Sequence, residues 1–144
     1  MRKVMVMALV LTAGVLIVVG SAVAASGGSP KTTTVHMRGS QEVGKGSPKG
    51  SGVFRFQLLP SSGKLCFSLT WSKIGTPTAS RLYKGAKGKA GAVVIVLSGK
   101  SPVKHSGCPK AAKSLIVAIG KKPGAYYVNV DTKKYPRGAI RGQL

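Results

Sequence analysis

The chain has 144 residues and a formal net charge of +21, from 23 lysines and arginines against 2 acidic residues. So few carboxylates leave little material for paired-acid catalysis, and so large a positive excess cannot be neutralised within the molecule. After the N-terminal segment described next, about 120 residues remain, which suffices for one domain with its own core.

The first 25 residues have the pattern of an export signal. Residues 1–3 are short and positive, residues 4–19 are almost uninterruptedly apolar, and residues 22–24 supply the small side chains that a signal peptidase requires. The apolar run is long enough that a retained N-terminal membrane anchor is the alternative interpretation. We expect cleavage near residue 25, a secreted or extracytoplasmic location, a short linker at 26–31 and one domain at 32–144.

Cys66 and Cys108 are the only cysteines of the chain. In an exported protein an even pair usually forms a disulfide, whereas two reduced thiols are the alternative. We therefore expect a Cys66–Cys108 bond, and closing so long a loop would contribute about 4 kcal/mol in the chain-entropy account.

Short apolar alternations, separated by loops rich in Gly, Pro, Ser and Lys, predict a mostly β domain. In the closing hairpin Tyr126, Val128 and Val130 alternate with a second, different face, and residues 139–144 alternate again after a turn at 133–138. Repeated crossover helices are missing, which favours an antiparallel β-sandwich over a parallel sheet. The other expected strands cover residues 32–38, 53–59, 65–71, 79–84 and 93–97.

One short helix is expected near residues 109–119. Leu115, Ile116 and Ile119 follow Ala112 at helical spacing, Pro109 suits a first turn, and Gly120 suits an end. The alternative is a buried strand over residues 115–119, because this stretch is short and partly β-branched.

Four stretches occur in the order found in the CHRD (chordin) domain family, and together they resemble it over nearly the whole chain after the leader. They are "GSQEV" at 39–43, a Gly-aromatic strand at 52–56, a Gly-rich turn at 85–91 leading into "VVIVL", and "PGAYYVNVDTKKYPRGAIRGQL" at 123–144. The resemblance implies an extracellular, immunoglobulin-like all-β domain whose role is usually thought of as binding. The polar positions of its motifs are Glu42, Tyr127, Asn129, Asp131, Arg141 and Gln143.

The chain departs from the family where the family commonly has imidazoles. Arg81, Tyr83 and Asp131 stand at those positions, and Ala139 replaces a usual glutamate. The two remaining histidines, His36 and His105, each lack a nearby second ligand at metal-site spacing. We therefore expect no metal ion and no cofactor.

Catalytic motifs are hard to assemble from these residues. Glu42 and Asp131 are far apart in sequence, no G-x-S-x-G elbow occurs, and "GSQEVGKG" at 39–46 lacks the Ser/Thr and the following helix of a phosphate-binding loop. The interpretation is a non-catalytic binding or envelope-associated module. The alternative from another class is a secreted hydrolase-like enzyme that uses Asp131 with Tyr127, Asn129 and Arg141.

The positive charge predicts affinity for polyanions. The expected partner is an anionic envelope polymer or an acidic surface, with nucleic acid bound only without specificity; the alternative is a solubilising surface with no dedicated ligand. If the loops at 85–91 and 131–138 share one end of the sandwich, six cations form one site: Lys84, Lys87, Lys89, Lys133, Lys134 and Arg137. We also expect arginines to hold both acids, with Arg38 and Arg141 as candidates for Glu42.

Overall fold

The computed structural model describes residues 28–144, so the predicted export signal and the first two linker residues lie outside the described part. The strands are β1 (Thr33–Arg38), β2 (Ser51–Leu59), β3 (Lys64–Ser72), β4 (Pro77–Lys84), β5 (Ala92–Ser98), β6 (Ser106–Gly107), β7 (Tyr126–Thr132) and β8 (Ile140–Gln143). The helices are α1 (Lys113–Lys121) and three 3₁₀ turns, η1 (Gly39–Gln41), η2 (Pro60–Ser62) and η3 (Pro123–Ala125). Among the described residues no helix is long and apolar enough to cross a bilayer.

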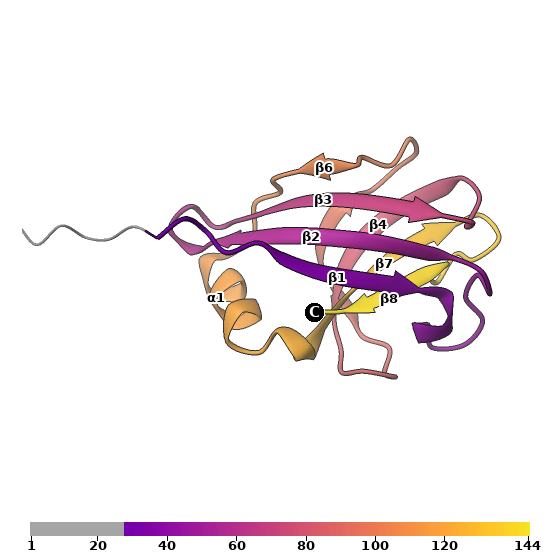
Figure 1. The fold of residues 1–144 in the computed structure, drawn as a ribbon. Coiled ribbons are helices and arrows are strands. Elements are labelled where there is room, and N and C mark those ends of the chain that lie inside the picture. Colours follow the sequence, from indigo (N-terminus) through magenta and orange to yellow (C-terminus); the bar gives the residue numbers. More distant parts are fainter. Residues whose placement is uncertain (1–27) are drawn as a thin grey trace, which may run out of the picture.

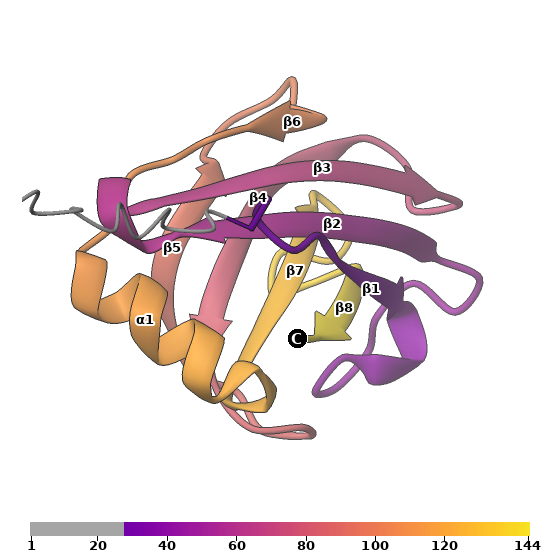
Figure 2. The ribbon, with the colours of Figure 1, turned by 60° about the vertical axis from the view of Figure 1, so that its left-hand side comes forward.

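The strands form one sheet in the order β5-β4-β7-β8-β1-β2-β3-β6, and every pairing between them is antiparallel. The sheet folds over on itself, so that β1, β2 and β3 lie in front of β4 and β7 (Figures 1 and 2). Strand β8 pairs with β7 on one side and β1 on the other, and thereby joins the two layers. The all-β antiparallel sandwich with one short helix is confirmed.

The core lies between the two layers and follows the strand alternation. Phe54 and Phe56 of β2 stack with ring centroids 5.4 Å apart and face Val128 and Val130 of the opposite layer's β7 across one buried cluster. Strand β3 contributes every second residue from Leu65 to Leu69 in the same way. Burying such apolar side chains supplies most of the driving force for folding.

The single α-helix covers one end of this core with Ile116 and Ile119, both fully buried. The helical prediction is confirmed and the strand alternative at 115–119 is wrong. The helix begins later than expected, because Pro109 still runs beside β3 and accepts a hydrogen bond from the Leu65 N–H. Gly120 lies inside the last turn instead of ending the helix.

Strand β7 has the two chemically different faces that the alternation predicted, and all seven of its residues are buried. Val128 and Val130 belong to the apolar core, whereas Tyr127, Asn129 and Asp131 occupy the opposite face. That polar face is covered by loops and by its own side-chain contacts. Buried polar groups require partners, so the contacts of this polar face define the candidate site.

The predicted disulfide is present between Cys66 of β3 and Cys108, with a Cα–Cα distance of 4.0 Å. Cys108 directly follows β6, the two-residue strand that pairs with β3. The bond therefore fastens the segment between β5 and α1 to the edge of the sheet.

Candidate functional site

Arg141 and Gln143 hold the loop between β4 and β5. Arg141 donates from Nη1 to the Lys89 carbonyl at 2.8 Å and from Nη2 to the Ala86 carbonyl at 2.9 Å and to Gln143 Oε1 at 3.1 Å. Gln143 Nε2 lies 2.9 Å from the Gly85 carbonyl. The two side chains thus satisfy loop carbonyls that have no strand partner, which is a structural task.

Tyr127 belongs to the same arrangement. Its hydroxyl accepts a hydrogen bond from the Gly91 N–H at 3.0 Å, and its ring stacks on Tyr83 with centroids 4.9 Å apart and planes 2° from parallel. The guanidinium of Arg141 lies over the ring, 3.4 Å from its centroid. Three of the predicted motif residues therefore meet, and together they fix the conformation of the 85–91 loop.

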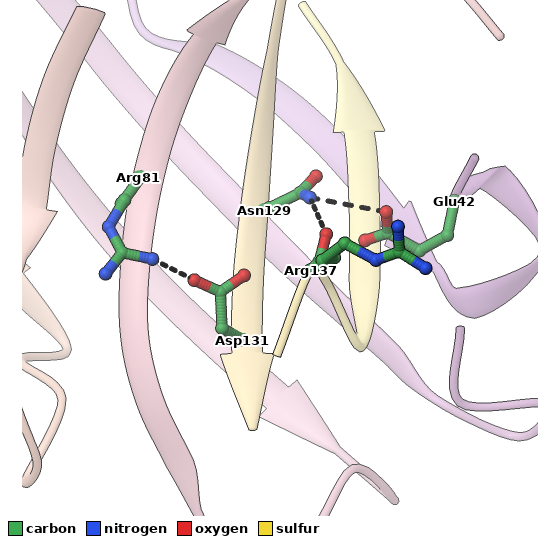
Figure 3. Close-up of polar contacts among 5 residues, drawn as sticks. All are labelled: Glu42, Arg81, Asn129, Asp131 and Arg137. Carbon is green, nitrogen blue, oxygen red and sulfur yellow. Dashed lines mark hydrogen bonds and ion pairs between the residues drawn. The ribbon is translucent and has the colours of Figure 1, made fainter. Parts of the chain in front are cut away.

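Glu42 and Asn129 connect η1 to the turn between β7 and β8 (Figure 3). Asn129 Nδ2 lies 3.3 Å from Glu42 Oε2 and 3.2 Å from the Arg137 carbonyl. Gly138 has φ +132°, and a Cβ there would collide with the side chains of both Glu42 and Asn129. The expectation that Arg38 or Arg141 would hold Glu42 is wrong, since within residues 28–144 neither forms a salt bridge with it and Asn129 takes that place.

The carboxyl group of Glu42 has a pKa above that of an ordinary glutamate. Burial raises the pKa of Glu42 to about 7, while Arg141 and the hydrogen bond from Asn129 act in the opposite direction. Its Oε1 atom is buried and has no hydrogen-bond partner among the described residues. The carboxyl group therefore changes charge close to neutral pH.

Asp131 pairs with Arg81 of the neighbouring strand β4 (Figure 3). The Asp131 side chain is 3% exposed and that of Arg81 is 30% exposed. Burial raises the pKa of Asp131 to about 6, and Arg81 limits the rise. The expectation of an arginine partner is confirmed for this acid, and two of the positions where the family commonly has imidazoles hold the two ends of an ion pair.

The six cations predicted as one polyanion site are all exposed, but they do not lie together. In the β4–β7 pairing Lys84 stands opposite Tyr126, and Pro77 stands opposite Thr132. The loop that follows Lys84 and the turn that follows Thr132 therefore leave opposite ends of the two strands, as Figure 1 shows. The condition of a shared end is not met, because β4 pairs antiparallel with β7.

A different set of cations gathers around the β7–β8 turn. One depression of about 680 Å³ is lined by residues 47–49, 73–76 and 132–135, and a second of about 600 Å³ by residues 42–45 and 134–138. Lys134 and Tyr135 line both, so the two depressions adjoin. We call the cations that border them the turn cluster: Lys45, Lys49, Lys73, Lys133, Lys134 and Arg137.

Ser47 ties together the three segments that carry the turn cluster. Its hydroxyl donates to the Lys73 carbonyl at 2.8 Å, and its N–H donates to the Ala139 carbonyl at 2.8 Å. The residue is 6% exposed. The loop before β2, the β3–β4 turn and the β7–β8 turn are thus joined by one buried residue.

A third depression, of about 330 Å³, is lined by His36 and Glu42 together with Lys87 and Arg141. No hydrogen bond joins His36 to Glu42 among the described residues. His105 lies elsewhere, where its ring stacks on Trp71 at 4.1 Å and its Nδ1 is 2.9 Å from the Leu69 carbonyl. Over residues 28–144, no group of three or more His, Cys, Asp or Glu side chains could hold a metal ion.

Sequence reasoning missed Lys73 and did not join Lys45 and Lys49 to the β7–β8 turn. The signal that connects them is the strand order: because β4 pairs antiparallel with β7, the turn before β4 and the turn after β7 meet at one end. That order depends on contacts between distant segments, which local patterns do not specify.

The comparisons with known proteins agree with the fold and the motifs. A family model described as the CHRD domain matches residues 33–144. Comparison with curated proteins and with solved structures gave no match. The matched range covers all eight strands and every predicted motif residue, and the chain belongs to the CHRD domain family.

Proposed function

We propose that this protein is an exported, non-catalytic binding module whose ligands are anionic polymers of the cell envelope. The observation that carries the proposal is uncompensated charge: the chain has a net charge of +21, and the Arg81–Asp131 pair is the one salt bridge within residues 28–144. A positive field of this size attracts polyanions and holds them through counterion release.

A non-catalytic role is consistent with how the polar motif residues are used. Arg141, Gln143 and Tyr127 have their polar atoms engaged by the 85–91 loop, and Asp131 is buried against Arg81. The hydrolase-like alternative requires Tyr127, Asp131 and Arg141 to face a substrate. It also requires Asn129, whose amide contacts Glu42 and the Arg137 carbonyl. Membership of the CHRD domain family, whose role is usually thought of as binding, supports the same proposal.

The test compares polymers that carry negative charge with one that carries none. Purified residues 26–144 should bind long-chain polyphosphate and polyglutamate at low salt and should not bind neutral dextran. The affinity for both polyanions should fall steeply as the salt concentration rises. Binding to dextran, or no binding to either polyanion, would remove the proposal. Export is tested separately by fusing residues 1–25 to a reporter protein and following its cleavage and location.

One observation favours a second candidate, an acid–base enzyme. His36 and Glu42 line the same depression, and a carboxyl group with a pKa of about 7 suits general acid catalysis. A hydrolytic activity that is abolished by Glu42→Gln and by His36→Ala, with both variants folded, would support this candidate over the first.

A further inference from the structure

We propose that the turn cluster is a docking surface for a flexible, linear polymer of phosphate groups. This inference rests on the proposed function and gives it a location and a ligand class. It also replaces the site predicted from the sequence, because Lys84, Lys87 and Lys89 lie at the end of β4 and β7 that is opposite the turn cluster.

The charges of the turn cluster converge from three segments. Lys45 and Lys49 come from the loop before β2, Lys73 from the β3–β4 turn, and the other three from the β7–β8 turn. Glu42 is the one acidic residue in the lining of either depression, and its raised pKa removes part of its charge at neutral pH. The positive fields of the six side chains therefore add with little opposition.

The backbone beneath these lysines is fixed before any ligand arrives. Ser47 joins the three segments through its hydroxyl and its N–H, and Asn129 holds the Arg137 carbonyl. Tyr135, at the shared wall of the two depressions, donates its N–H to the Thr132 carbonyl at 3.1 Å. A preformed surface loses less conformational entropy on binding than a mobile loop does.

Lys73 has a backbone conformation that lysine rarely adopts, with φ +59°. Glycine or asparagine would occupy this left-handed region at lower cost. Lys73 lines the larger of the two depressions, which is consistent with a ligand-binding role for the side chain.

The shape and composition of the cluster indicate the ligand class. Two adjoining depressions that share Lys134 and Tyr135 accept a thin chain, whereas the flat surface of a bilayer cannot enter them. Five of the six cations are lysines, which bind phosphate as point charges on flexible stems and without the fixed bidentate geometry of arginine, so they suit a flexible chain whose phosphates take many orientations. Successive phosphates of one chain can then contact successive lysines.

The experiment compares three variants that lose the same charge. The cluster variant is Lys73→Gln, Lys133→Gln and Lys134→Gln; the loop variant is Lys84→Gln, Lys87→Gln and Lys89→Gln; the scattered variant is Lys31→Gln, Lys100→Gln and Lys113→Gln. All nine lysines are exposed, so each variant should fold, which circular dichroism and urea unfolding verify. The ligand is long-chain inorganic polyphosphate, and affinity is measured from low to physiological salt.

We expect the affinity of the cluster variant to be lower by about tenfold or more. The plot of its log affinity against log salt should be shallower, with a slope smaller in magnitude by about 2. The loop and scattered variants should each lose about threefold or less. Equal losses in all three variants, or the largest loss in the loop variant, would overturn the location while leaving the proposed function standing.

Two further results bear on the ligand class. Tighter binding to vesicles of anionic phospholipid than to polyphosphate, at matched phosphate concentration, would overturn the linear polymer as the ligand. Failure of the unmodified protein to bind polyphosphate and polyglutamate alike would overturn the proposed function together with this inference.

Discussion

The guanidinium of Arg141 lies 3.4 Å from the centroid of the Tyr127 ring, and the same guanidinium donates hydrogen bonds to the carbonyls of Lys89 and Ala86. A strand residue near the C-terminus therefore fixes a loop more than fifty positions earlier in the chain. Because arginine combines a flat stacking face with several donors in one plane, no other side chain can make all these contacts at once.

Replacing Arg141 by lysine should lower the free energy of unfolding by about 2 kcal/mol, since one ammonium cannot replace the stacked face and both carbonyl contacts. Urea unfolding measures the loss. Arg55→Lys, at an exposed site of β2, is the matched control and should change stability by less than about 0.5 kcal/mol. Equal stabilities of the two variants would show that the 85–91 loop does not depend on Arg141.

The Arg81–Asp131 pair should make the free energy of unfolding depend on pH. The folded pKa of Asp131, about 6, lies above its ordinary value of 3.8, so the folded state holds the proton more tightly and stability declines as pH rises between these values. Arg81→Met removes the one effect that limits this pKa, so the variant should be close to the unmodified protein near pH 5 and less stable by about 2 kcal/mol near pH 8.

The control for this pair is the double variant Arg81→Met with Asp131→Asn, which leaves no charge to be buried alone. It should recover much of the stability lost at high pH. If Arg81→Met lowered the free energy of unfolding by the same amount at both pH values, the assignment of the effect to Asp131 would be contradicted.

The disulfide should make a large contribution to stability. Cys66 and Cys108 are separated by 42 positions, and closing a loop of that length restricts the unfolded chain by about 4 kcal/mol in the entropic account. Replacing both cysteines by serine should lower the unfolding free energy by roughly that amount, as measured by urea unfolding. A loss below about 1 kcal/mol would indicate that β6 is held in place by its own contacts.

Much of the fold was predictable because the signals were local. The alternation in residues 126–131 and 139–144, the turn chemistry between them and the spacing of Ile116 and Ile119 each depend on neighbours within one element, and each is confirmed. The helix start was misplaced at Pro109 because residues 106–110 run beside β3, which is a long-range contact.

The candidate site was less predictable, for the same physical reason. The motif residues were found as polar positions in a family resemblance, but their partners are distant carbonyls such as those of Lys89 and Gly85. The placement of basic loops required the strand order, in which β4 skips its sequence neighbour β3 and pairs with β7. Neither composition nor local periodicity contains that information.

Lys73 offers a test in which stability and binding move in opposite directions. Lys73→Gly should raise the free energy of unfolding by about 0.5–1 kcal/mol, because glycine tolerates φ +59° without the Cβ penalty. The same change should weaken polyphosphate binding, since a cation leaves the turn cluster. Lys73→Gln separates the two effects: it should weaken binding without stabilising the fold. A stabilised Lys73→Gly that binds as tightly as the unmodified protein would exclude Lys73 from the surface.

Glu42 should make polymer binding sensitive to pH near neutrality. Its carboxyl lines the depression that holds Lys45, Lys134 and Arg137, and it faces Arg141 of β8, Asn129 and Asp131 of β7. Because the folded pKa of Glu42 is about 7, against an ordinary value of 4.5, the group is neutral below that pH and anionic above it. Affinity for polyphosphate should therefore fall as pH rises through about 7, when a negative charge appears beside the bound phosphates.

The variant Glu42→Gln keeps an oxygen that can accept from Asn129 but cannot ionise, so its affinity should stay level between about pH 6 and about pH 8 and should exceed that of the unmodified protein at the upper end. His36 lines the neighbouring depression together with Glu42, so His36→Gln is the necessary control. We expect His36→Gln to keep the pH dependence. If the dependence disappears in His36→Gln and persists in Glu42→Gln, the effect arises from His36, and the assignment of the pH dependence to Glu42 is wrong.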